Sequence, residues 1–124
     1  MTMADSISAA RVGGPSTLAD GKVGYEFRFA ANDPTFAGHF PGHPILPGVF
    51  QVEMTRAAAE WRLGCRMAVR EVTKAKFLRP ISPAETIQMQ LSLSETGNIV
   101  LARASLSVGG QAAGENSMIL CRGA

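Results

Sequence analysis

His39 and Glu53, 14 positions apart in a chain of 124 residues, carry the side chains best suited to proton transfer. The loop that holds His39 also contains Pro41, Pro44 and Pro47, and prolines restrict the backbone and remove N–H donors. An imidazole in such a stiff loop can act as a base near neutral pH. An ordinary surface or core histidine is the plainer interpretation, and the residue type alone favours it.

Glu53 falls on a stripe of a predicted helix that is otherwise apolar. Helical spacing puts it one turn after Val49 and Phe50 and one turn before Ala57. Desolvation there would favour the protonated carboxyl group, which could then donate a proton at neutral pH. The alternative is an ion pair with Arg56, three residues on, and the periodicity does not choose between the two.

Gly48 follows Pro47 at the predicted start of this helix. The first N–H groups of a helix lack intrahelical acceptors and carry the positive end of the dipole, so they can bind a carbonyl oxygen that gains negative charge. Glycine leaves the approach to its amide open. A tight corner between loop and helix is an equally good reason for a glycine here.

Metal chemistry is not expected from this chain. His39-x-x-x-His43 with Glu53 could form a metal triad, but the prolines hinder a helix that would align the two imidazoles. Cys65 and Cys121 form no Cys-x-x-Cys pair, which argues against a zinc module and a disulfide scaffold and fits a reducing compartment.

The elements that must position these groups follow from the apolar pattern. Gly48 to Leu63 contains no proline and no interior glycine and is followed by Gly64, so we expect a helix of about four turns. Its apolar residues wrap more than half the circumference, which predicts an embedded helix. Alternating apolar residues predict strands over 22–29, 67–77, 87–93, 100–108 and 112–120. The sequence therefore predicts an α+β fold, with an antiparallel sheet of five to six strands wrapped around one central helix at about 48–63.

Domain organisation and location follow from composition. With 46% hydrophobic and 18% charged residues and a mean hydropathy of +0.09, the chain fits one domain. We expect residues 22–124 to form it and residues 1–21 to be a flexible segment, with a short strand near Val12. Because we find neither a signal peptide nor an apolar run long enough for a membrane span, we expect a cytoplasmic protein with no membrane partner.

The basic residues are clustered. Seven of the twelve Lys and Arg residues fall between Arg56 and Arg79, although the net charge is only +2. This segment could face an acidic partner, and a solvated helix end and strand face is the plainer alternative. Nucleic acid is not expected, because few aromatic residues interleave with the basic ones.

One run of residues matches a known family. His39-Phe40-Pro41-x-x-Pro44-x-x-Pro47-Gly48-Val49, with Glu53 beyond it, resembles the hot-dog fold 3-hydroxyacyl-(acyl carrier protein) dehydratases of fatty-acid synthesis. Lys76-Phe77-Leu78-Arg79-Pro80-Ile81-x-Pro83 is similar to a second block of that family. The chain departs from the family by having Ala57 where a glutamine is frequent and by lacking an N-terminal His-Arg-x-Pro-Phe segment. It thus resembles a short variant, acting in fatty-acid, polyketide or aryl polyene-like biosynthesis.

The resemblance implies a reaction and an assembly. His39 would remove a C2 proton, Glu53 would act as the catalytic acid that releases the C3 hydroxyl as water, and the Gly48 backbone N–H would bind the thioester carbonyl. The product would be a trans-2-enoyl thioester. The site would lie at the interface of a homodimer, with histidine and acid from different subunits. No cofactor is implied beyond the phosphopantetheine that carries the substrate.

The resemblance also suggests binding surfaces and competing functions. Candidates for the acyl tunnel are Phe40, Val49, Phe50 and Phe77, each of which could equally be ordinary core. The acidic acyl carrier protein would dock on Arg62, Arg66, Arg70, Lys74, Lys76 and Arg79. One alternative is a hot-dog acyl thioesterase that uses Glu53 to activate water. The other is a non-catalytic dimer that only binds acyl groups.

Overall fold

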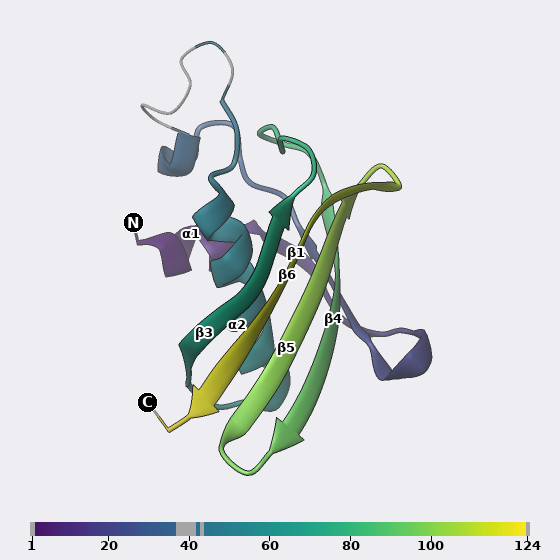
Figure 1. Ribbon diagram of the computed structural model, residues 1–124. Coiled ribbons are helices and arrows are strands. Elements are labelled where there is room, and N and C mark those ends of the chain that lie inside the picture. Colours follow the sequence, from purple (N-terminus) through teal and green to yellow (C-terminus); the bar gives the residue numbers. More distant parts are fainter. Residues whose placement is uncertain (1, 37–41, 43, 124) are drawn as a thin grey trace.

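A six-stranded antiparallel sheet curls around one long helix (Figure 1). A computed structural model gives the structure of residues 2–36, 42 and 44–123. The strands are β1 (Arg11–Thr17), β2 (Val23–Phe27), β3 (Met67–Phe77), β4 (Ile87–Thr96), β5 (Ile99–Val108) and β6 (Gln111–Arg122), in the order β1-β2-β4-β5-β6-β3. The helices are α1 (Met3–Ala10) and α2 (Gly48–Leu63), with short 3-10 turns η1 (Ala19–Gly21) and η2 (Pro34–Phe36). The predicted α+β class and the wrapped helix are confirmed.

The strands β4 and β5 show why alternation predicted the sheet. Met89 pairs with Leu106 and Leu91 pairs with Ala104, and all four side chains are buried against α2. The residues between them point to the outer face, which is the pattern of a sheet with one covered face.

The ends of α2 lie where the sequence predicts them. Pro47 has an extended backbone and precedes the helix. Gly64 ends it with φ of 70° and donates its N–H to the Glu60 carbonyl at 2.8 Å. Glycine adopts this left-handed conformation without the steric penalty of a side chain.

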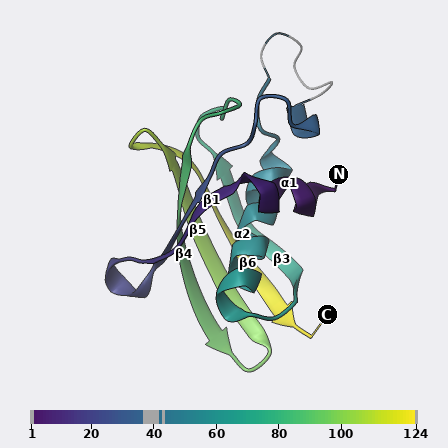
Figure 2. The same ribbon diagram turned by 180° about the vertical axis from the view of Figure 1, so that it is seen from behind.

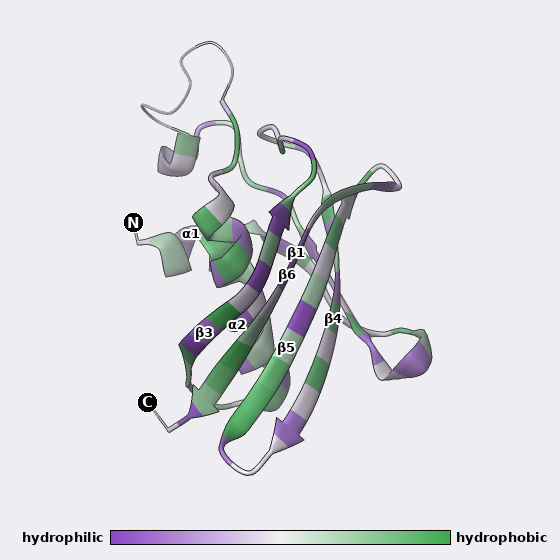
Figure 3. Ribbon diagram, in the orientation of Figure 1, coloured by the Kyte–Doolittle hydropathy of each residue, from purple (hydrophilic) through white to green (hydrophobic). Residues whose placement is uncertain are grey.

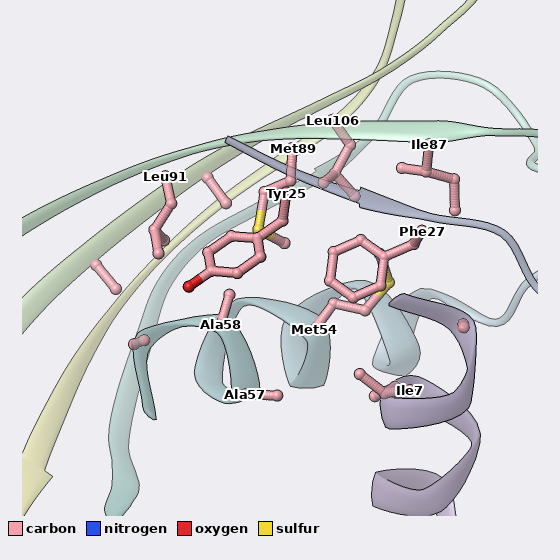
Figure 4. Close-up of a cluster of buried hydrophobic side chains, with 14 of the residues drawn as sticks. Ile7, Tyr25, Phe27, Met54, Ala57, Ala58, Ile87, Met89, Leu91 and Leu106 are labelled. Carbon is pink, nitrogen blue, oxygen red and sulfur yellow. The ribbon is translucent and has the colours of Figure 1, made fainter. Parts of the chain in front are cut away.

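The buried face of α2 is only partly the predicted one. Ala57, Ala58 and Ala59 are buried, and these small side chains let the helix lie close to Tyr25 and Phe27 of β2 (Figure 4). Val49, by contrast, is 57% exposed. The buried residues of the helix are Gln51, Met54, Thr55, Ala57, Ala58 and Ala59, so two polar side chains lie on its inner face.

An aromatic cluster joins α2 to the first two strands. The Trp61 ring lies 5.7 Å from the Tyr25 ring and 6.0 Å from the Phe27 ring, measured between centroids. The Arg11 guanidinium of β1 lies 4.5 Å from the centroid of the same indole, which is cation–π distance.

Residues 2–21 belong to the folded domain, which corrects the predicted flexible segment at 1–21. The Thr2 side chain caps α1 and Asp5 completes a capping box. Ile7 is fully buried, and α1 lies beside α2 on the same side of the sheet (Figure 2). β1 pairs with β2, so the strand expected near Val12 is confirmed. The sequence signal for α1 is short, because Met3, Ile7 and Ala10 follow helical spacing over only eight residues.

β3 forms one edge of the sheet. It pairs with β6 on one side, and within residues 2–36, 42 and 44–123 no strand pairs with the other side. Hydrophilic and hydrophobic residues alternate irregularly along it (Figure 3), and Val69, Val72 and Phe77 are all exposed. No helix in the described part of the chain combines the length and the apolar character needed to cross a bilayer.

Candidate functional site

The start of α2 brings Gly48 against an aromatic ring. Pro47 provides no side-chain cap for the helix. In the first turn the Phe50 N–H donates to the Pro47 carbonyl at 3.0 Å, whereas the Gly48 N–H has no acceptor among the described residues and remains available to a ligand. A Cβ atom built on Gly48 would lie 2.7 Å from the Cζ atom of Phe77. Close packing against β3, rather than a positive φ, is therefore a structural reason for glycine at this position.

Glu53 takes part in the ion pair that the sequence left open. The Arg56 Nε donates to Glu53 Oε1 at 2.7 Å, and the Nη2 of Arg56 contacts the same oxygen. The Glu53 side chain is 23% exposed and that of Arg56 is 19% exposed. The hydrogen bond to Glu53 raises the pKa of Arg56 further above its usual value.

Gly48 and Glu53 lie on different sides of α2. Glu53 is five positions after Gly48, which corresponds to about 140° around the axis and about 7.5 Å along it. Glu53 lies on the side of α2 that reaches the first residue of β3, through Arg56 and the Met67 carbonyl. The Gly48 amide lies at the other end of β3, beside Phe77.

His39, Phe40 and His43 lie outside the described residues, but the chain on either side is well anchored. Asp33 Oδ1 accepts hydrogen bonds from Ser6 at 3.1 Å and from the Thr35 backbone N–H at 2.8 Å. Burial acts to raise the pKa of Asp33, but a hydrogen bond from the Thr35 hydroxyl at 2.5 Å, together with these two, outweighs it and lowers the pKa below its usual value. After the loop, the Leu46 N–H donates to the Ile81 carbonyl at 2.8 Å.

A second anchor lies in the segment between β3 and β4. The Ser82 backbone N–H donates to Glu85 Oε1 at 2.7 Å, and Arg79 Nη2 contacts Glu85 Oε2 at 3.0 Å. The Ser82 hydrogen bond is the main cause that lowers the pKa of Glu85. A pocket of about 410 Å³ opens between this segment and the loop before α2, and it is lined by Gly42, Pro44, Ile45, Pro80, Ser82 and Pro83.

The tunnel candidates occupy different environments. Val49 and Phe77 are 57% and 54% exposed beside Gly48. Phe50 packs edge-on against the buried Phe29, with ring centroids 6.1 Å apart. Val49 and Phe77 are thus available to a ligand or a second subunit, whereas Phe50 is part of the packing under the helix.

Sequence reasoning missed a buried polar group beneath α2. Gln51 is 2% exposed and Asn116 is 1% exposed, and Asn116 donates to the Gln51 carbonyl at 3.4 Å. The side-chain oxygens of both residues have no hydrogen-bond partner among the described residues. The spacing of Gln51, Met54, Thr55 and Ala58 places them on one face of the helix. Two of these four residues are polar, so an apolar pattern did not mark this face as buried.

The predicted docking residues form two groups. Lys74 and Lys76 contact Glu115 at 2.7 and 3.9 Å, and Arg79 pairs with Glu85. Arg62, Arg66 and Arg70 are exposed and have no acidic partner in the described part of the chain. These three arginines lie toward the end of α2 and the start of β3, at the opposite end of the helix from Gly48.

No three His, Cys, Asp or Glu side chains gather as a metal site within residues 2–36, 42 and 44–123. His39 and His43 fall outside these ranges.

Comparison with known proteins connects this geometry to a family. A family model described as ApeI-like, ApeI dehydratase, matches residues 16–112. The chain is 36% identical over 103 residues to 3-hydroxyacyl-(acyl-carrier-protein) dehydratase FabZ of Chlamydia trachomatis serovar L2, covering 73% of this chain and 67% of that protein. It is 39% identical over 69 residues to the protein of the same name from Wolbachia sp. subsp. Drosophila simulans, covering 50% of this chain and 48% of that protein. The chain thus spans about half the length of this relative.

Solved structures share the hot-dog fold. The dehydratase heterocomplex ApeI:P from Xenorhabdus doucetiae superposes with a TM-score of 0.71 at 24% identity, covering 90% of this chain and 96% of that one. A probable thioesterase from Bartonella henselae superposes with a TM-score of 0.64 at 13% identity, covering 82% and 89%. At these identities the two structures establish the fold and not the reaction.

Proposed function

This chain belongs to the ApeI-like dehydratase family, and we propose that it removes water from a 3-hydroxyacyl thioester on an acyl carrier protein to give a trans-2-enoyl thioester. The observation that carries the proposal is the first two turns of α2. They bring an uncapped glycine amide and a half-buried carboxyl group into one helix, directly after the motif that contains His39.

The proposed mechanism uses three groups of the protein. The His39 imidazole takes the C2 proton while the Gly48 N–H holds the thioester carbonyl oxygen, on which negative charge develops. Glu53 gives its proton to the C3 hydroxyl, the C3–O bond breaks, and water leaves as the C2–C3 double bond forms. A preorganised oxyanion donor of this kind typically lowers the barrier by about 3 to 4 kcal/mol.

We propose a homodimer joined through β3. An exposed edge strand of 11 residues offers unpaired backbone groups to a second copy, and a two-fold contact of this kind is self-complementary. Glu53 lies on the side of α2 that faces the start of β3, which favours a site completed across such an interface. The relative from Xenorhabdus doucetiae is described as a heterocomplex, so the mass of this chain alone is a necessary measurement.

Within the predicted docking surface, the structure favours the three arginines without acidic partners. Arg62, Arg66 and Arg70 are free to meet an acidic carrier protein, whereas Lys74, Lys76 and Arg79 already have carboxylate partners. The proposed reaction needs no cofactor of its own, because phosphopantetheine carries the substrate, and we place it in the cytoplasm.

A thioesterase is the second candidate, and one observation favours it. Arg56 contacts Glu53, and a carboxyl group held in an ion pair is an arrangement that also suits a general base acting on water. The fold is compatible with hydrolysis, since a probable thioesterase shares it.

Product analysis separates these functions. The purified protein is incubated with 3-hydroxyacyl thioesters of several chain lengths, linked to carrier protein or to coenzyme A, and the products are identified by mass spectrometry. We expect the enoyl thioester, with activity strongly reduced in His39→Ala and in Glu53→Gln and unchanged circular dichroism spectra. Free acid would identify a thioesterase, and binding without turnover would identify an acyl-binding protein. Full activity in both variants would refute the assigned residues.

A further inference from the structure

Arg56 lies at the centre of a network that links Glu53 to the sheet. On one side its guanidinium binds Glu53 Oε1. On the other side Nη1 lies 2.7 Å from Glu60 Oε2 and donates to the Met67 carbonyl at 3.2 Å. Glu60 Oε2 also accepts the Met67 backbone N–H at 2.8 Å. Both backbone groups of the first residue of β3 therefore take part.

This network differs from an ordinary surface ion pair. Exposed pairs on a helix are free to move and contribute little to stability. Here the three charged side chains are only 19% to 25% exposed, and Met67, to which two of them bind, is 3% exposed. The position of Arg56 is consequently fixed by the backbone of a strand that is buried at this point.

The charges of the network suit a carboxyl group that changes its protonation state. With both carboxylates ionised, one guanidinium balances one of two negative charges. If Glu53 takes up a proton, Glu60 still pairs with Arg56, so no partly buried cation is left without a counter-ion. When Glu53 loses the proton, Arg56 is in place to stabilise the anion that forms.

We propose that Arg56 is a positioning residue that fixes the Glu53 carboxyl group for proton transfer, and that Glu60 and Met67 hold Arg56 in place. The proposal rests on the proposed function of Glu53. In the dehydration step the Glu53 proton passes to the departing hydroxyl oxygen while His39 accepts the C2 proton, and the resulting Glu53 carboxylate remains bound to Arg56. The Glu53 proton is then replaced from solvent, to which His39 returns its own.

A double-mutant cycle on kcat and KM tests this role. We expect Arg56→Gln to lower kcat at least tenfold with little change in KM, because the substrate is bound but the acid is misplaced. Arg56→Lys should recover only part of kcat, since an ammonium group cannot form the same fork. In a Glu53→Gln background, measured at high enzyme concentration in single turnovers, Arg56→Gln should lower the rate less than twofold further.

Glu60→Gln is the matched control. It removes the second counter-ion of Arg56 but keeps an oxygen that can accept from the Met67 N–H and from Arg56, so we expect a loss of kcat of about threefold, smaller than that of Arg56→Gln. Thermal unfolding of each variant is followed by circular dichroism. If Arg56→Gln and Glu60→Gln lowered kcat equally, and in proportion to the fall in their unfolding temperatures, Arg56 would have only a structural role. An undiminished effect of Arg56→Gln in the Glu53→Gln background would also overturn the proposal.

A spectroscopic measurement keeps this proposal separate from the reaction itself. In protein labelled with carbon-13 at the glutamate carboxyl groups, the Glu53 signal is the one missing from Glu53→Gln. We expect Arg56→Gln to shift that signal and Glu60→Gln to leave it nearly in place. An unshifted signal would overturn the role of Arg56 even in an active dehydratase. A shifted signal in a protein that neither dehydrates nor hydrolyses would refute the proposed function and leave the pair supported.

Discussion

Gly48 has two physical reasons to be a glycine, and each concerns a single pair of atoms. The Phe77 ring lies where a Cβ would be, and the helix amide has no side chain in front of it. The first reason is about packing and the second about ligand approach. The packing reason could be found only in the structure. The sequence suggested a backbone corner at Gly48, but it gave no sign of contact with a ring 29 residues further along the chain.

A pair of variants separates the two reasons for Gly48. Gly48→Ala should destabilise the protein by about 1 to 3 kcal/mol, because the added methyl group overpacks the contact with Phe77. Adding Phe77→Ala should restore stability in urea unfolding, since the ring is removed. We expect activity to remain low in the double variant if the amide binds the thioester carbonyl. Recovery of activity together with stability would show that glycine is needed for packing alone.

Glu85 should make the free energy of unfolding depend on pH in a predictable way. Its pKa is lowered below the usual 4.5, chiefly by the Ser82 backbone N–H and also by Arg79. A carboxyl group with a lowered folded pKa contributes stability above its unfolded pKa and loses that contribution as the pH falls through the folded pKa. We therefore expect Glu85→Gln to flatten the pH dependence of unfolding between about pH 5 and pH 3. A variant with the unaltered wild-type slope would contradict this.

At the scale of elements, the sequence predicted the helix and strands that have clear end residues or clear apolar alternation, and it missed the helix that has only a short pattern. The bounds of α2 follow from Pro47 and Gly64, and the strands follow from alternation that the sheet register confirms. α1 was not predicted, although Thr2 and Asp5 have the spacing of a capping box and Ile7 and Ala10 lie on one face, because eight residues rich in Ser and Ala give only a short signal. Of the candidate site, the roles of His39, Gly48 and Glu53 stay predictions, and the contact between Glu53 and Arg56, which the periodicity left open, needed the position of Arg56 in the fold.

The docking of α1 is testable through one side chain. Ile7 is fully buried, and removing a buried aliphatic side chain costs about 2 to 5 kcal/mol. We expect Ile7→Ala to lower the midpoint of urea unfolding by a corresponding amount, whereas Ser8→Ala, at an exposed position of the same helix, should change it little. Equal effects of the two substitutions would indicate that α1 is not packed as described.

At the scale of the whole molecule, the edge strand β3 is the interface of the proposed homodimer. Val72 lies in the middle of this strand with 42% of its surface exposed. We expect Val72→Lys to halve the mass measured by light scattering, because a charge on an edge strand opposes pairing with a second strand. Leu101→Lys, which adds the same charge at an exposed position of β5, should leave the mass unchanged. A wild-type mass of about 13.1 kDa would show a monomer and refute the homodimer.

The proposed docking of a carrier protein can be tested at Arg66 and Arg70, which have no acidic partner in the part of the chain that the structure describes. Charge reversal at Arg66 and Arg70 should raise KM for carrier-linked substrates several-fold and reduce its dependence on salt. The same substrates linked to coenzyme A serve as the control, and their KM should change little. Equal changes for both thioester types would place these arginines at the substrate rather than at the carrier.

Trp61 ties three elements together, since its indole lies between the Tyr25 and Phe27 rings of β2 and the Arg11 guanidinium of β1. It is also the only tryptophan of the chain. The intrinsic fluorescence of the protein therefore comes from one indole at the junction of the long helix with the first two strands. A change in its emission will therefore report, without any label, the separation of β1 from α2.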